Sequence, residues 1–98
     1  MAERKVIWAA RANTELAEIL AYFLDRNKSG AYSIKLAISF DKAVQQIVKN
    51  PSIGRPTSKL QVRVLPVKEY LIFYLVQETE IKILSVWDNR QDIKKREV

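Results

Sequence analysis

The chain has 98 residues, a length that predicts one domain over residues 1–98 with a single hydrophobic core. Hydrophobic residues make up 48% of the chain and charged residues 29%, which is typical of a globular protein and not of a disordered one. The 17 lysines and arginines exceed the 11 acidic residues, giving a net charge of +6. This charge favours a polyanion or an acidic protein as partner, although a soluble basic domain without such a partner fits it too.

The chain contains no cysteine and no histidine. These absences exclude disulfides, thiolate metal sites and the commonest zinc ligand, and we expect neither a metal nor a cofactor. Acid–base chemistry would need a perturbed carboxylate, lysine or tyrosine instead. The sequence shows no apolar run of the length of a signal peptide or a membrane span, so we expect a reduced, cytoplasmic setting and no membrane partner.

The N-terminal part of the chain reads as a short strand followed by a helix. Residues 5–8 are mostly apolar and predict the strand. Apolar residues then recur at helical spacing in one stripe, which consists of Leu16, Ile19, Leu20, Phe23 and Leu24. Asn13 or Thr14 is the predicted N-cap of this helix.

A second helix is predicted over residues 31–49. Ser29 and Gly30 separate it from the first helix, because serine and glycine together mark a break. The helix ends at Asn50 and Pro51, since the residue before a proline disfavours the helical region. A break this short between two helices predicts an antiparallel helical hairpin.

The second half of the chain has the pattern of strands. Residues 52–59 read SIGRPTSK and predict a loop, and three strand-like runs follow at residues 61–65, 70–76 and 81–87. The connections between the runs are short enough for β-hairpins. The predicted fold is therefore α+β, in the order β-α-α-β-β-β, with the helical hairpin packed on one face of a mostly antiparallel sheet.

Alternation along the first of these runs predicts which side chains face the helices. If the helices cover the face that carries Val62 and Val64, then Gln61 and Arg63 point to the opposite, open face. Cations from distant parts of the chain would then converge around this face and its rim: Arg55, Arg63, Lys68, Arg90, Lys94, Lys95 and Arg96. Such a cluster binds phosphates or acidic side chains, whereas the alternative is that each is an ordinary solvated charge.

Aromatic residues allow the same two interpretations. Tyr70, Phe73, Tyr74 and Trp87 could stack on nucleic-acid bases, but residues at this strand spacing are more often part of a core. Trp8 is predicted to pack against the first helix. The sequence contains no Ser–His–Asp arrangement, no glycine-rich phosphate loop and no spacing typical of metal ligands.

Three blocks of the sequence resemble the RelE/ParE superfamily of bacterial toxins from type II toxin–antitoxin modules. They are NPSIGRPT at residues 50–57, VRVLPVKEYLIFYLV at residues 62–76 and IKILSVWDNRQD at residues 81–92. The order and spacing of the blocks carry the resemblance, and it extends over nearly the whole chain from residue 6 to residue 92. The β-α-α-β-β-β order predicted above fits the fold of that superfamily.

The resemblance implies one of two activities. RelE-like members cut mRNA on the ribosome with basic residues on the open sheet face and a late tyrosine or histidine, whereas ParE-like members inhibit DNA gyrase. The arginine that RelE-like members place on the central strand is Leu71 here, the position that is often histidine is Asp88, and no tyrosine follows Tyr74. Arg63 and Arg90, in contrast, match basic residues of the RelE-like members. Since two contributions to cleavage are missing, the ParE-like activity is favoured.

The leading hypothesis is therefore a ParE-like toxin that inhibits DNA gyrase by binding and is neutralised by a ParD-like antitoxin in a hetero-oligomer. The residues predicted to contact the target are Arg55, Arg63, Arg90, Gln91, Lys94, Lys95 and Arg96. Those predicted to bind the antitoxin, as exposed apolar positions, are Tyr22, Phe23, Ile38, Phe40 and Trp87. Residues 93–98 are expected to form a flexible tail.

Two alternatives stay open at this point. The first is a ribosome-dependent mRNA endoribonuclease in which Arg63 and Arg90 hold the phosphate, while Asp88 or Lys68 transfers protons. The second is a relic that is no longer toxic but still binds its antitoxin.

Overall fold

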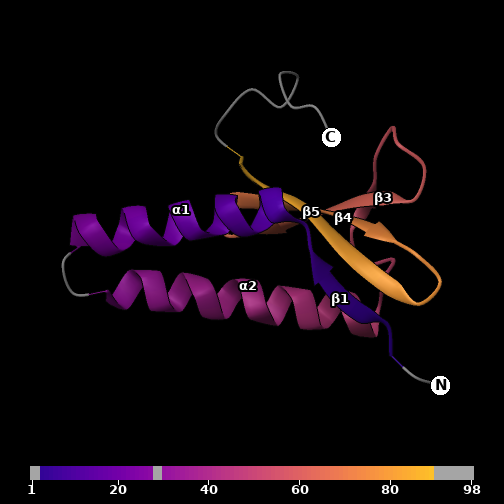
Figure 1. Cartoon of the computed structure of the whole chain (residues 1–98), viewed down its shortest axis with the longest axis horizontal. Coiled ribbons are helices and arrows are strands. Elements are labelled where there is room, and N and C mark those ends of the chain that lie inside the picture. The colour runs from indigo at the N-terminus through magenta and orange to yellow at the C-terminus, as the bar shows by residue number, and fades with distance from the viewer. Residues whose placement is uncertain (1–2, 28–29, 90–98) are drawn as a thin grey trace.

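The computed structural model describes residues 3–27 and 30–89, and it places two helices against a five-stranded sheet (Figure 1). The elements in chain order are β1 (Lys5–Trp8), α1 (Ala10–Asn27), α2 (Ala31–Lys49), β2 (Arg55–Pro56), β3 (Val62–Val67), β4 (Tyr70–Val76) and β5 (Glu80–Asp88). The predicted α+β fold with a helical hairpin on the sheet is confirmed. The two-residue strand β2 adds one element to the predicted order, because part of the predicted loop pairs with β3.

The sheet is mixed, with the strand order β1-β5-β4-β3-β2. β1 runs parallel to β5, and the other neighbouring strands are antiparallel. The β3–β4 hairpin turns at Lys68, whose φ of 57° is in the left-handed region that tight hairpin turns require. Gln61 also has a positive φ, of 66°, and lies in the turn that precedes β3, although it was predicted to be the first residue of that strand.

Both helices pack on one face of the sheet, and Figure 1 shows the far half of the hairpin extending beyond the strands. The stripe of α2 that faces the core consists of Leu36, Phe40, Ala43, Val44 and Ile47. These residues meet the covered face of the central strands, where Ile72, Ile81 and Ile83 are fully buried. Burial of a contiguous apolar layer between helices and sheet is the main stabilising contribution in a fold of this size.

The start of α1 differs from the prediction. The helix begins at Ala10, and the Asn13 N–H already donates to the Ala9 carbonyl over 3.0 Å, so neither Asn13 nor Thr14 is an N-cap. Ala10 and Ala12 have high helix propensity, and Ala12 is fully buried in the core. Packing directly after β1 therefore decides where the helix begins.

The two faces of β3 are the reverse of the predicted ones. Arg63 pairs across the strands with Tyr74, a residue of the core beneath the helices, whereas Val64 pairs with Phe73 on the other face. Residues directly opposite each other in an antiparallel pair project to the same side, so Arg63 lies on the helix-covered face. Alternation correctly separated the two sets of side chains, but it could not tell which set faces the helices.

The face away from the helices carries a small apolar cluster of its own. Val64, Leu71 and Phe73 are buried there, and Leu84 and Trp87 pack against them half-buried. A bulge in β5 contributes to this cluster: Ser85 pairs with Phe73 and Ile83 pairs with Tyr74, which leaves Leu84 as the extra residue. We call Val64, Leu71, Phe73, Leu84 and Trp87 the open-face cluster. The centre of the open face is therefore apolar, where the sequence had predicted cations.

Candidate interaction surfaces

Arg63 is held by the loop between α2 and β2. Its Nη1 donates to the Gly54 carbonyl over 2.6 Å and lies 3.4 Å from the Ser52 carbonyl. The Tyr74 hydroxyl donates to the Pro51 carbonyl over 2.8 Å and accepts from the Gly54 N–H over 2.9 Å. Two side chains of the covered face thus satisfy the backbone of residues 51–54, which we call the 51–54 loop.

Gly54 is required by the close approach of this loop to the sheet. A Cβ at that position would lie 2.6 Å from the Tyr74 hydroxyl oxygen and 2.9 Å from the Val64 carbonyl oxygen, both shorter than a non-bonded contact allows. Burial raises the pKa of Tyr74, and the Gly54 hydrogen bond and the Arg63 charge oppose that rise. The hydroxyl is therefore protonated at neutral pH and serves as a structural donor.

The cations that were expected to converge are spread over the described structure. Arg55 pairs with Val64 and so lies on the open face, while its neighbour Pro56 pairs with Arg63. Lys68 is exposed in the β3–β4 turn, five residues beyond Arg63 and hence about 16 Å along the strand. Arg55, Arg63 and Lys68 therefore do not form one cluster. The other cations and the glutamine predicted to contact a target, and the tail at residues 93–98, lie outside the described residues: Arg90, Gln91, Lys94, Lys95 and Arg96.

Exposed apolar side chains gather instead on the helical hairpin. Tyr22 is 53% exposed and Ile38 is 50% exposed, as expected of positions available to a partner. Sequence reasoning missed Leu24 and Ile34, which are 54% and 61% exposed. The spacing of Ile34 and Ile38, one turn apart and out of step with the core stripe of α2, was the signal that could have found Ile34, whereas Leu24 was assigned to the apolar stripe of the first helix. Ile34 and Ile38 lie on the same side of α2, and we call these two residues the hairpin patch.

Two of the predicted antitoxin contacts are placed differently. Phe40 is only 1% exposed and packs near Tyr70, with ring centroids 5.9 Å apart, so the expectation that it is exposed is wrong. It belongs to the stripe of α2 that faces the core. Phe23 is half-buried in an edge-to-face arrangement with Tyr22 and Tyr32, at centroid distances of 5.1 and 4.7 Å.

A groove of about 450 Å³ runs between α1 and the end of β5. Its lining residues are Glu15, Glu18, Ile19, Tyr22, Tyr70, Val86, Trp87 and Asp88. Glu15 fixes one side, because its Oε1 accepts the Val86 N–H over 2.9 Å and its Oε2 lies 3.4 Å from Arg11 Nε. Trp87 and Asp88, both predicted site residues, meet here and far from Arg63. We call this cavity the α1–β5 groove.

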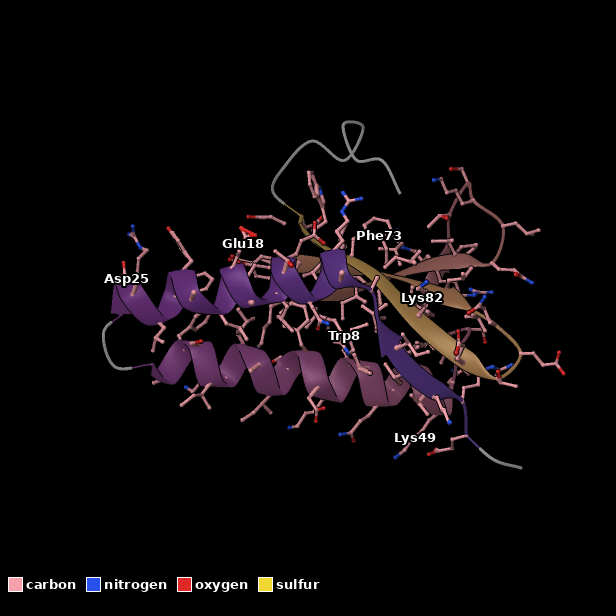
Figure 2. All side chains as sticks on the ribbon, in the orientation of Figure 1. Trp8, Glu18, Asp25, Lys49, Phe73 and Lys82 are labelled. Atoms are coloured by element: carbon pink, nitrogen blue, oxygen red, sulfur yellow. The ribbon has the colours of Figure 1, made fainter. Side chains whose placement is uncertain are left out.

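A second groove, of about 550 Å³, lies between β1 and α2. Its charged lining residues are Glu3, Arg4, Asp41 and Lys49, and its apolar ones include Trp8 and Val44. Figure 2 shows Trp8 near this groove and Glu18 projecting from α1 on the side away from α2. The two signs of charge are thus balanced in this second groove, which we call the α2–β1 groove.

Within residues 3–27 and 30–89, neither helix is long and apolar enough to cross a membrane.

Two solved structures have a fold similar to this one. The structure is similar to one solved as the chromosomal ParDE toxin–antitoxin system from P. aeruginosa, with a TM-score of 0.73, 21% identity, and coverage of 88% of this chain and 96% of the other. It is also similar to the YoeB dimer from Staphylococcus aureus, with a TM-score of 0.59, 17% identity, and coverage of 88% and 97%. No curated protein sequence gives a significant match.

At these identities the solved structures establish a shared fold. The family is established by sequence: the model of the family described as the ParE toxin of the type II toxin–antitoxin system parDE matches residues 6–93. The match covers every element from β1 to β5 apart from the first residue of β1. The chain therefore belongs to the ParE toxin family of type II toxin–antitoxin systems.

Proposed function

We propose that this toxin inhibits DNA gyrase by binding to it, without cleaving a nucleic acid, and that a ParD-like antitoxin neutralises it. The observation that supports binding over cleavage is the use of Arg63 and Tyr74 by the 51–54 loop. Both groups are types that could stabilise or protonate a phosphate, yet their polar atoms are engaged by backbone groups of that loop. A cleavage site needs charge and proton donors aimed at the reacting atoms.

Leu71 points to the same conclusion. It occupies the position where the RelE-like relatives have an arginine, and at 3% exposure it is buried in the open-face cluster. A buried leucine contributes packing and no charge at the place where cleavage would need a cation. Inhibition by binding requires only a complementary surface, which the exposed Arg55 on the open face can serve.

A supercoiling assay tests the activity. Purified toxin at micromolar excess over gyrase is expected to abolish supercoiling of relaxed plasmid, and equimolar antitoxin is expected to restore it. The matched comparison is translation of a defined message on ribosomes in the presence of the same toxin. Intact gyrase activity together with a cleaved message would overturn the proposal and favour the endoribonuclease.

The hairpin patch is the surface that we propose for the antitoxin. Ile34 and Ile38 expose apolar area on one side of α2, and such surface is stabilised when a partner covers it. Ile38→Asp should weaken antitoxin binding by about tenfold or more. Leu60→Asp is the matched control, because Leu60 is 89% exposed and lies in the loop before β3. Equal affinity of the two variants in calorimetry would remove the hairpin patch from the interface.

A further inference from the structure

The connection between β2 and β3 presents the most exposed large apolar side chain of the described residues. It consists of residues 57–61, which we call the 57–61 loop, and its Leu60 is 89% exposed, whereas Ile34 comes next at 61%. Figure 1 shows the chain before β3 as a loop that stands out from the sheet, apart from the turn between β4 and β5. A single exposed leucine is common on protein surfaces, so the order of the loop around it decides whether it has a role.

Hydrogen bonds of Thr57 hold the 57–61 loop in one shape. The Thr57 Oγ1 accepts the Lys59 N–H over 3.2 Å and donates to the Val62 carbonyl over 3.0 Å, and the Thr57 N–H donates to the same carbonyl over 3.1 Å. The Val62 N–H in turn donates to the Lys59 carbonyl over 3.2 Å. The backbone is therefore fixed on both sides of Leu60, and ordering it on binding costs little further entropy.

Gln61 adds a strained residue to the same loop. Its φ of 66° is in the left-handed region, which costs free energy in a residue other than glycine. The Val76 N–H donates to the Gln61 carbonyl over 3.2 Å and so ties this residue to the end of β4. The turn thus holds Leu60 out in solvent at a cost in stability, an arrangement typical of residues that contact a partner.

The 57–61 loop lies in the part of the sequence that carries the excess positive charge. No acidic residue occurs between Asp41 and Glu69, and the lysines and arginines outside this stretch equal in number the 11 acidic residues of the chain. Lys59 is exposed directly beside Leu60, and Arg55 is exposed on the open face at the base of the same β-hairpin. The six cations of the stretch are Lys42, Lys49, Arg55, Lys59, Arg63 and Lys68. A partner that binds the loop is therefore expected to be acidic around the point that contacts Leu60.

We propose that Leu60 inserts into an apolar pocket on an acidic protein surface, and that carboxylates around the pocket pair with Lys59 and Arg55. A leucine side chain has no donor or acceptor for a phosphate, so the chemistry of the loop fits a protein better than a nucleic acid. The 57–61 loop belongs to the sheet and stands out from it, whereas the hairpin patch lies on α2, so the two surfaces are separate (Figure 1). The inference rests on the proposed function in one respect: the protein that offers the pocket is DNA gyrase.

Inhibition of gyrase supercoiling by variants of the full chain tests the role of Leu60. The toxin concentration that gives half inhibition should rise about tenfold in Leu60→Ala and about a hundredfold in Leu60→Asp, because the pocket loses its occupant or receives a charge. Leu60→Met should stay within about twofold, since methionine fills a similar volume. Leu24→Asp is the matched control: Leu24 is 54% exposed on α1, and the same change there should leave inhibition as it is.

The hydrogen bonds and the charge of the loop are tested by separate variants. Thr57→Val removes the hydroxyl and its hydrogen bonds, so half inhibition should need about fivefold more toxin. Lys59→Gln should need about threefold more, whereas Glu78→Gln, in the turn between β4 and β5, should behave like the unmodified chain. The far-UV circular dichroism spectrum and the antitoxin affinity of the Leu60 variants should be unchanged, which would show that these variants are folded.

Full inhibition by Leu60→Asp would overturn the role of the loop. Loss of inhibition in Lys59→Gln together with full inhibition in Leu60→Ala would indicate a charge contact with nucleic acid, and it would overturn the pocket as well.

Failure of the gyrase proposal is distinguishable from failure of the loop. If the unmodified chain leaves gyrase active, the gyrase proposal fails, and the loop is then tested by growth arrest after induction in a bacterial host. Arrest that is lost in Leu60→Asp and kept in Leu24→Asp would support the loop against another protein target, whereas equal arrest by Leu60→Asp and the unmodified chain would overturn it. A chain that neither inhibits gyrase nor arrests growth would overturn both proposals.

Discussion

The two faces of the sheet differ in how their side chains are packed. The covered face carries a contiguous core with the helices, in which Ile72, Tyr74 and Ile81 are fully buried. The open face has only the open-face cluster, with Arg55 at its rim. The covered face also contains the arginine that was expected to contact the target. An arginine on a strand is therefore not evidence for a binding surface until its partners are known.

The largest expected effect separates the two faces by stability. Phe40→Ala should lower the free energy of unfolding by about 4 kcal/mol, because it leaves a cavity between α2 and the sheet. Leu84→Ala, in the half-buried part of the open-face cluster, should cost about 1 kcal/mol. Urea denaturation of both variants measures the difference. Similar losses from the two substitutions would contradict the unequal roles of the faces.

The 51–54 loop joins the covered face to α2, and Gly54→Ala tests that connection. The added Cβ would overlap the Tyr74 hydroxyl and the Val64 carbonyl, so we expect a loss of about 3 kcal/mol in the free energy of unfolding. Ser58→Ala, an exposed change in the following loop, should cost less than about 0.5 kcal/mol. A Gly54→Ala variant as stable as the Ser58→Ala control would show that the loop has room to move away from the sheet.

Tyr74→Phe removes the two hydrogen bonds that the hydroxyl makes with the 51–54 loop and should lower the free energy of unfolding by about 2 kcal/mol.

Burial raises the pKa of Tyr74 in the folded protein above its unfolded value of about 10. The stabilisation of the folded protein that follows from this raised pKa is therefore fully present below pH 10, and it is lost as pH rises through the folded pKa. Thermal unfolding between pH 8 and pH 12 should show a steeper alkaline loss for the unmodified chain than for Tyr74→Phe. Parallel curves would rule out Tyr74 as the source.

The smallest expected effect distinguishes two arginines that are close in the fold. Arg63→Met should lower stability by about 1.5 kcal/mol, because the Gly54 carbonyl loses its donor, and should leave gyrase inhibition per folded molecule unchanged. Arg55→Met, on the open face, should leave stability within about 0.5 kcal/mol and weaken inhibition. The reverse pattern, with inhibition lost in Arg63→Met alone, would make the covered face part of the target interface.

The residues of the candidate surfaces were predictable to different degrees. Tyr22 and Ile38 were found as exposed apolar positions on helices, and Trp87 and Asp88 as residues at the end of the last strand. Glu15 and Glu18 were missed as lining residues, because they are distant in sequence from the part of β5 that they face; Glu15 and Val86 are 71 residues apart. With the helix predicted to begin near Asn13 or Thr14, the two glutamates were attributed to the helix dipole, so nothing local indicated a groove.

The sequence by itself determined the elements and their order, apart from the two-residue strand β2. Helical periodicity set α2, the Asn50-Pro51 pair ended it, and the apolar run at residues 70–76 was the central strand β4. Only the tertiary structure decided which face of β3 meets the helices, where α1 begins and which arginine is structural. The physical reason is that periodicity is a property of neighbouring residues, whereas the side of a sheet that becomes buried depends on contacts between residues far apart in the chain.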